Sequence, residues 1–212
     1  ILRIAAPPTL AHWFLHGLLA KFSQREPETR IQIEIGSGAD VVTMVANGNM
    51  DLGLVDSGQN HMGVRFVAFR SSDAHATIPA ESPLAKLKEV TPHDLDGMPF
   101  IALVRRFPSR TQLDRLFLGA GVEPNIVIEV STAVAAYEFV RAGIGVAIIN
   151  PFPMSLRQDA DVCFRPFRPT IAYETSFVLP SMTPPSAVAR RFIDFVREHQ
   201  PEDGYSLALR AA

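Results

Sequence analysis

Two stretches of the chain share a pattern in which a helical segment stops at a glycine and a short apolar run follows. One runs from Ala46 to Val55 and turns at Gly48, and the other runs from Val140 to Pro151 and turns at Gly143. Glycine readily takes the left-handed conformation at a helix end, and the β-rich run Ile144–Ile149 is typical of a buried strand. Two such units about ninety residues apart predict two similar α/β lobes, and small ligands usually bind in the cleft between lobes.

Strands and helices are expected to alternate along both lobes. For the first lobe, apolar spacing and turn signals predict strands at residues 2–6, 30–35, 51–55 and 64–69, and helices at residues 9–25 and 41–48. For the rest of the chain they predict strands at residues 74–78, 100–104, 126–130, 146–149, 162–167 and 172–179, and helices at residues 109–118, 132–142 and 185–199. Right-handed βαβ connections would make each sheet mostly parallel.

Four loops lead from a predicted strand into the start of a helix, at residues 7–10, 36–40, 105–109 and 131–133. Free backbone N–H groups and the helix dipole attract anions at such positions, which lie at the carboxyl edge of an open sheet. The expected N-caps are Thr9, Ser37, Ser109, and either Ser131 or Thr132. Each of them either only caps its helix or also contacts a ligand, and the four loops together favour a cleft for a carboxylate.

Composition narrows the class of protein. The chain has 212 residues, 47% of them hydrophobic, which suffices for one large or two small cores. A net charge of −2 with 20 dispersed Lys and Arg residues excludes a basic nucleic-acid surface in this segment. The single cysteine, Cys163, excludes an internal disulfide and a multi-thiolate metal site, and favours the cytoplasm. No apolar run is long enough for a membrane span, and the start at Ile1 without Met suggests that an upstream segment has been removed.

Candidate catalytic and metal-binding patterns are weak. His12 and His16 are spaced as a helical metal pair, but Trp13 stands where a metalloprotease has its glutamate. We interpret these three residues as surface or interface positions and expect no metal. The predicted loops offer hydroxyls, arginines and backbone amides instead of a positioned acid, base or nucleophile, so we expect neither an enzyme nor a cofactor. Arg105 and Arg106 lie in one of these loops, either facing a ligand or solvated.

An ordered set of segments resembles the effector-binding domain of LysR-type bacterial transcriptional regulators. These segments are residues 2–5, 8–10, 22–27, 45–54, 79–84, 94–97, 140–151 and 189–198. The pair Asn150-Pro151 and the run Phe164–Phe167 are most similar to the branch that senses amino acids and opines such as octopine, nopaline or diaminopimelate.

The resemblance implies a two-lobed, type-2 periplasmic-binding-protein-like α/β fold with two crossover strands. Lobe I would comprise residues 1–72 and 178–212, and lobe II residues 73–177. It also implies a winged helix-turn-helix domain that is absent from this chain, so that DNA would be bound only by the full-length protein. A solute-binding protein of a transporter and an enzyme of the same fold are the alternatives.

The resemblance further implies which residues contact the effector, a small carboxylate such as an amino acid or opine. They are Thr9, Leu10, Ser37, Gly38, Ala39, Phe107, Ser109, Thr132, Ala133 and Asn150. The helix with His12, Trp13 and His16 would contact the second lobe of a partner in a homodimer, with a tetramer for the full-length protein. One departure from the family is the bulky, basic run Arg105–Pro108, which leaves the identity of the effector open.

Overall fold

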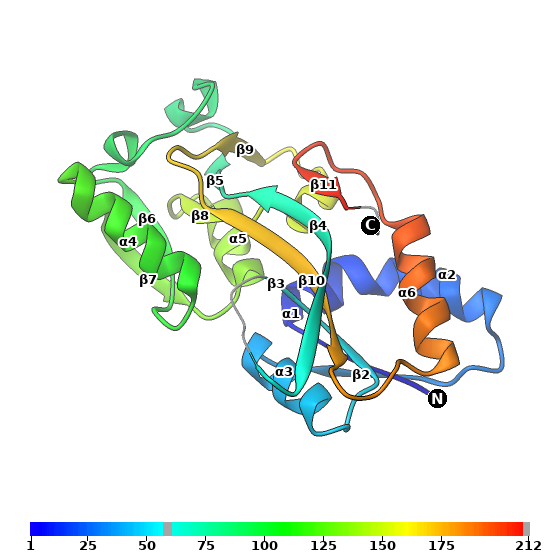
Figure 1. The fold of residues 1–212 in the computed structure, drawn as a ribbon. Helices are drawn as coiled ribbons and strands as arrows, with labels where there is room; N and C mark the ends of the chain where they lie inside the picture. Colours follow the sequence, from blue (N-terminus) through cyan, green and yellow to red (C-terminus); the bar gives the residue numbers. More distant parts are fainter. Residues whose placement is uncertain (57–60, 210–212) are drawn as a thin grey trace. The chain divides into compact units, whose positions relative to one another are not determined.

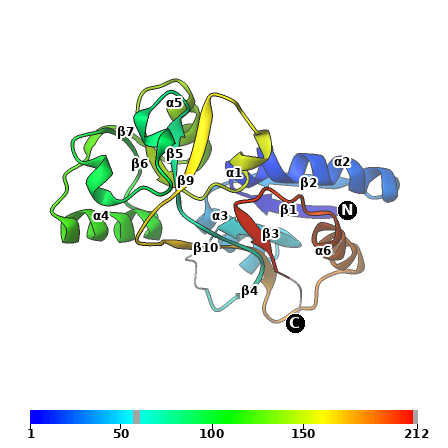
Figure 2. The ribbon, with the colours of Figure 1, turned by 90° about the horizontal axis from the view of Figure 1, so that it is seen from above.

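The computed structural model describes residues 1–56 and 61–209, and the chain divides into two compact units (Figure 1, Figure 2). Unit 1 comprises Ile1–Ser71 and the chain from Glu174 onward, and unit 2 comprises Ser72–Tyr173. The chain passes between the units twice, within strand β4 (Val64–Asp73) and within strand β10 (Ala172–Pro180). Over the described residues, no helix is long and apolar enough to cross a membrane.

Unit 1 is built on a six-stranded sheet in the order β11-β4-β10-β3-β1-β2 (Figure 1). Its other strands are β1 (Leu2–Ala6), β2 (Ile31–Ile35), β3 (Leu52–Asp56) and β11 (Ser206–Ala208). Strand β1 pairs in parallel with β2 and with β3, whereas β10 runs antiparallel to β3. The carboxyl ends of β1, β2 and β3 therefore lie at the same edge of the sheet.

The helices of unit 1 pack closely on this sheet through apolar side chains. They are α1 (Pro8–Leu10), the π-helical turn η1 (Ala11–Leu15), α2 (His16–Arg25), α3 (Gly38–Ala46) and α6 (Ala187–His199). Helix α3 lies so near β3 that a Cβ atom at Gly53 would clash with Val41. Helices α2 and α6 meet at Phe22, whose ring centroid lies 5.1 Å from that of Phe192 and 5.4 Å from that of Phe195.

Unit 2 combines a parallel pair of strands with an antiparallel group. Strands β6 (Pro99–Leu103) and β7 (Asn125–Val130) are parallel. Strand β5 (His75–Pro79) runs antiparallel to both β8 (Ala147–Ile149) and β9 (Val162–Pro166). A parallel bridge between Phe100 and Val146 joins the two groups, so β7, β6 and β8 end at one edge. The helices are α4 (Pro108–Ala120), α5 (Ala133–Arg141) and the 3-10 turns η2 (Pro83–Lys86), η3 (Pro92–Leu95) and η4 (Met154–Arg157).

The prediction of mostly parallel sheets is wrong for β5, β10 and their neighbours. These two strands enter from the crossings between the units and not through a strand–helix–strand connection, which is what enforces parallel pairing. The strand predicted at residues 146–149 is confirmed to within one residue as β8, but the apolar Ile144 before it is not part of a strand. Gly143 adopts a φ of +77°, and Gly145 passes so close to the Pro99 carbonyl that it has no room for a Cβ atom. The strand therefore begins only at Ala147, and Ile144 is exposed.

Two of the four expected N-caps are confirmed and two are wrong. Ser37 and Thr132 accept hydrogen bonds from the backbone N–H groups of Asp40 and Ala135. Thr9 and Ser109 instead lie inside the first turn of α1 and α4, whose N-caps are Pro7 and Phe107. A proline follows each true cap, and its fixed φ suits the first helical position, so both helices begin earlier than predicted. The long first helix is also interrupted by the π-helical turn η1.

Candidate functional site

The site residues expected in unit 1 follow the carboxyl ends of β1 and β2. These ends are neighbours, because Ala6 is in register with Ile35 and the Gly36 N–H donates to the Ala6 carbonyl at 3.2 Å. Thr9 and Leu10 lie directly after β1 and are buried. The structure therefore brings Thr9 and Leu10 to the same edge as Ser37, Gly38 and Ala39.

The start of α3 already has an acidic partner from its own first turn. The Asp40 carboxylate accepts hydrogen bonds from the Ser37 N–H at 2.9 Å and from the Ser37 hydroxyl at 2.6 Å. The Ser37 hydroxyl in turn accepts from the Asp40 N–H. This capping box places negative charge where an incoming carboxylate would need positive potential. The backbone N–H groups of Gly38 and Ala39 remain without an intrahelical partner, as at any helix start.

The Thr9 hydroxyl, unlike that of Ser37, is not bonded to a carboxylate of its own helix. It makes no capping hydrogen bond, and no acidic residue stands in the first turn of α1. A buried hydroxyl near a helix start can donate to an anion without adding a competing negative charge. In unit 1 the local electrostatics therefore favour the Thr9 side of the edge over the Ser37 side.

The site residues expected in unit 2 also share one carboxyl edge. Phe107 and Ser109 follow β6, Thr132 and Ala133 follow β7, and Asn150 follows β8. The parallel register of β6 with β7 and the bridge from β6 to β8 put these three strand ends side by side. Helices α4 and α5 both begin here, and neither has an acidic residue in its first turn. This edge thus presents two helix N-termini that carry no carboxylate of their own.

The buried side chain of Arg110 links the elements that form this edge. This role was not predicted from the sequence. Arg110 is 3% exposed, and its guanidinium donates to the Leu103 carbonyl, to Glu129 at 2.8 Å and to Asp114 at 2.7 Å. Burial disfavours the charge, but the hydrogen bonds to Asp114 and Glu129 outweigh it and raise the pKa of Arg110 above its usual value. Arg110 thereby fixes the first turn of α4 against the ends of β6 and β7.

The two arginines of the preceding loop are exposed. The Arg105 guanidinium lies 3.9 Å from Asp114, a carboxylate that Arg110 already holds. The Arg106 guanidinium carbon lies 5.6 Å from the ring centroid of Phe107. Both side chains add positive charge beside the unit 2 edge, and among the described residues neither forms a hydrogen bond with a carboxylate.

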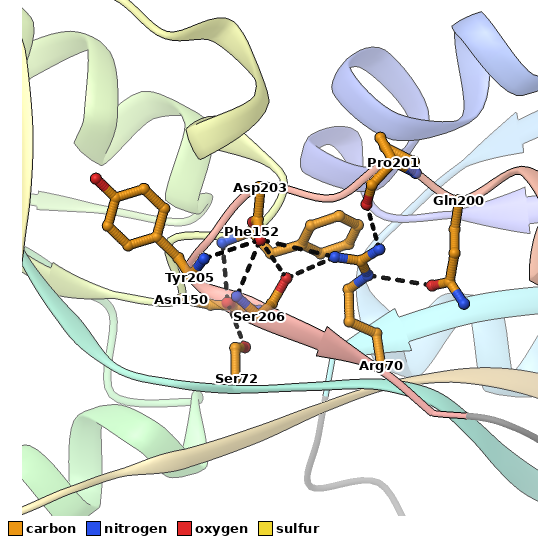
Figure 3. Close-up of polar contacts among 9 residues, drawn as sticks. All are labelled: Arg70, Ser72, Asn150, Phe152, Gln200, Pro201, Asp203, Tyr205 and Ser206. Carbon is orange, nitrogen blue, oxygen red and sulfur yellow. Dashed lines mark hydrogen bonds and ion pairs between the residues drawn. The ribbon is translucent and has the colours of Figure 1, made fainter.

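Asn150 is buried at the end of β8, with an exposed fraction of 3%. Its Oδ1 accepts hydrogen bonds from the Ser72 hydroxyl at 2.7 Å and from the Phe152 N–H at 3.1 Å (Figure 3). Its Nδ2 has no hydrogen-bond partner among the residues that the structure describes. Of the expected contact residues, Asn150 therefore presents a buried donor that has no acceptor among the described residues.

The expected interface residues lie on η1 and at the start of α2. His12 and His16 are exposed and Trp13 is half-buried. The described residues contain no cluster of three or more His, Cys, Asp or Glu side chains that could hold a metal ion. Two edge strands also expose apolar side chains, Ile33 and Ile35 on β2, and Ile126 and Val127 on β7.

Comparison of the chain with family models and with known proteins leads to the same family in both cases. Residues 1–201 match the family model described as the LysR substrate binding domain. The transcriptional activator protein LysR of Escherichia coli K12 is 27% identical over 201 residues, which cover 95% of this chain and 65% of that protein. The chain thus spans a little under two thirds of the length of that relative.

Solved structures show the same fold. HinK, a LysR family regulator from Pseudomonas aeruginosa, superposes with a TM-score of 0.78 at 24% identity, covering 93% of this chain and 68% of HinK. The effector-binding domain of QuiR in complex with shikimate superposes with a TM-score of 0.71 at 18% identity, covering 92% of this chain and 93% of the other. Both support a two-lobed α/β effector-domain fold.

Proposed function

Because the chain belongs to the LysR substrate-binding-domain family, we propose that it senses a small carboxylate, such as an amino acid or an opine, for a transcription regulator. Residues of both carboxyl edges would contribute to the effector site. Effector binding would shift the population of conformations, and the DNA-binding part of the full-length oligomer would respond to that shift. DNA would be bound by a segment outside this chain.

The observation that carries the carboxylate proposal is the electrostatic character of the unit 2 edge. Two helices begin there without an acidic residue in the first turn, and Arg105 and Arg106 stand beside it. Asn150 adds a buried amide donor. All of these groups favour an anionic acceptor, and none of them is a general base or a nucleophile.

In unit 1 we assign the leading role to Thr9 and Leu10. The Thr9 hydroxyl lies at a helix start that carries no acid, whereas the Ser37 hydroxyl is engaged by Asp40. Gly38 and Ala39 would contribute backbone N–H groups. On this proposal the Ser37 hydroxyl donates to Asp40 and stabilises the loop, whereas the Thr9 hydroxyl donates a hydrogen bond to the effector.

A thermal-shift screen of amino acids, opines and aromatic acids tests the proposal, because a ligand that binds only the folded state raises its melting temperature. Each hit should be compared with its carboxamide, which keeps the skeleton and removes the charge. We expect stabilisation by at least one carboxylate and none by its carboxamide. A chain that no carboxylate stabilises, or that both forms stabilise equally, would not have the proposed site.

Two other classes share the fold, an enzyme and a transporter's solute-binding protein. Relatives such as LysR are transcription regulators, and the two edges offer donors instead of acid–base pairs. We therefore expect the bound carboxylate to be recovered unchanged after prolonged incubation with the chain. Turnover seen in its NMR spectrum would favour the enzyme.

We further propose a homodimer through the helix that carries His12, Trp13 and His16, and a tetramer of the full-length protein in the cytoplasm. A half-buried tryptophan between two exposed histidines is typical of an interface position. The exposed isoleucines of β2, an edge strand of the same unit, supply further apolar area.

A further inference from the structure

Asn150 Nδ2 and Thr77 Oγ1 are the buried side-chain groups of unit 2 without a hydrogen-bond partner among the described residues, and Asn150 is the one at the carboxyl edge. Buried polar side-chain atoms usually have a partner, because a donor removed from water without an acceptor costs free energy. Asn150 is 3% exposed, and in the described part of the chain its Nδ2 has no partner. An acceptor is therefore expected to come from a bound molecule.

The orientation of this amide follows from the groups around it. The Phe152 N–H lies 3.1 Å from Oδ1, and because a backbone N–H can only donate, the atom facing it must be the amide oxygen. The Ser72 hydroxyl lies 2.7 Å from the same oxygen and donates to it as well (Figure 3). Both lone pairs of Oδ1 are then used. The NH₂ group is held on the other side of the amide, free to donate.

We propose that Ser72 is a positioning residue which, together with the Phe152 N–H, fixes the Asn150 amide so that its Nδ2 donates to a carboxylate oxygen of the effector. The inference rests on the proposed function in one respect, namely that Asn150 contacts the effector. Ser72 acts through Asn150. A negative acceptor at Nδ2 polarises the amide, so effector binding also strengthens the two hydrogen bonds that Oδ1 accepts.

Ser72 also connects this amide to the strand that joins the units. It is the first residue of unit 2 on β4 and lies two positions after Arg70. Side chains two apart on a strand share a face, so Arg70 and Ser72 anchor the same face of β4 on either side of the crossing (Figure 3). Arg70 is held by the C-terminal segment of unit 1, through Gln200 and Ser206. A carboxylate bound at Asn150 Nδ2 would therefore act, through Ser72, on the unit 2 end of β4. Arg70 fixes the unit 1 end of the same strand.

Acetate is a suitable probe because it is a small carboxylate whose oxygen can accept a hydrogen bond from Nδ2. The Asn150 side-chain NH₂ signal is followed in ¹⁵N NMR spectra of the 212-residue chain, and is assigned by its loss in Asn150→Ser. Sodium acetate is titrated against sodium chloride at constant ionic strength. We expect a saturable shift of this signal in the parent chain, from which the Kd for acetate follows.

Ser72→Ala should raise the Kd for acetate about fivefold, the change expected on loss of one ordinary hydrogen bond. It should also speed hydrogen exchange of the Phe152 amide, because the shared acceptor is less fixed. Ser72→Thr keeps the hydroxyl and should restore both properties. Ser71→Ala is the matched control, since it makes the same change at the neighbouring position, where the side chain faces the opposite side of β4.

Urea midpoints show whether each variant is folded. The inference is overturned if acetate does not move the Asn150 signal saturably in the parent chain. It is also overturned if Ser72→Ala matches Ser71→Ala in acetate affinity and in Phe152 exchange. A carboxylate hit in the thermal-shift screen with an unmoved Asn150 signal removes only this inference. A moved signal without any hit removes the amino acids, opines and aromatic acids of the screen as effectors and leaves the carboxylate contact at Asn150.

Discussion

Arg70 and Asp203 form an ion pair that is almost completely withdrawn from solvent, with 3.8 Å between Nη1 and Oδ1 and side-chain exposures of 1% and 0% (Figure 3). Burial lowers the pKa of Arg70, and the Asp203 carboxylate opposes that shift. The guanidinium also donates to the Ser206 hydroxyl at 2.6 Å and to the Pro201 carbonyl. Asp203 accepts from the Ser206 N–H and hydroxyl, which orders the turn before β11. One side chain of β4 thus fastens the chain after α6 to the sheet.

Replacing Arg70 by Met should therefore destabilise the chain strongly. Removal of one partner of a buried ion pair leaves the other charge uncompensated, which costs about 3–5 kcal/mol. Arg65→Met is the matched control on the same strand, where the arginine is exposed, and should change stability by less than about 0.5 kcal/mol. Urea denaturation measures both. Equal midpoints for the two variants would show that the buried pair does not hold the C-terminal segment.

Tyr137 gives the chain a pH dependence on the alkaline side. Burial, followed by the hydrogen bond to Asp159 at 2.9 Å, raises the pKa of Tyr137 far above its ordinary value of 10.0. Below about pH 10 the phenol is protonated in both folded and unfolded chains, so its contribution to stability is fully present. Above that pH the unfolded chain loses the proton first, and the contribution declines as the pH rises.

Between pH 9 and pH 11 the parent should therefore lose about 1.4 kcal/mol more stability than Tyr137→Phe. The variant should be less stable than the parent at pH 7, by about 1.5–3 kcal/mol, because the hydrogen bond to a charged carboxylate is lost. The raised pKa of the half-buried Cys163 thiol acts in both chains and cancels in the comparison. Urea midpoints at the three pH values provide the measurement, and parallel pH profiles would contradict the assignment.

Much of the fold was predictable because local signals and tertiary packing agree. Gly48 and Gly143 both adopt positive φ where the sequence predicts a helix end. The expected alternation of strands and helices placed the proposed contact residues after strands β1, β2, β6, β7 and β8, which the structure brings to two sheet edges.

What escaped prediction depends on partners distant in sequence or on competing local signals. The local sequence does not show that Arg70 and Arg110 are buried, because Asp203 and Glu129 lie on other elements and the pair of Arg110 with Asp114, four residues on, is equally common on an exposed helix face. Strand β11 is short and largely exposed, so it lacks an apolar pattern. Ser109 has the residue type of an N-cap, but Pro108 before it already occupies the first helical position.

Trp13→Glu should shift the chain from dimer toward monomer without unfolding it. A buried charge opposite a partner's apolar surface is costly, whereas in a free monomer a half-buried position can turn the carboxylate to water. Ala20→Glu, at an exposed position of α2, is the control and should leave the association unchanged. Sedimentation velocity measures the association. A parent chain that is already monomeric, or a Trp13→Glu chain that stays dimeric, would refute the interface.

Thr9→Val tests the hydroxyl that we assign to the effector in unit 1. Valine has nearly the same shape as threonine but cannot donate a hydrogen bond, and Thr9 caps no helix, so the fold should lose little. Loss of one hydrogen bond to a charged group should weaken binding of a carboxylate hit by about 1.5–3 kcal/mol, or roughly tenfold to a hundredfold. Thr183→Val, in an exposed loop of the same unit, makes the same chemical change away from the edge and should bind like the parent. Calorimetry on the three chains separates the possibilities, since unchanged affinity in Thr9→Val would move the effector contact to the backbone N–H groups of Gly38 and Ala39, while equal losses in both variants would reflect a general effect on unit 1.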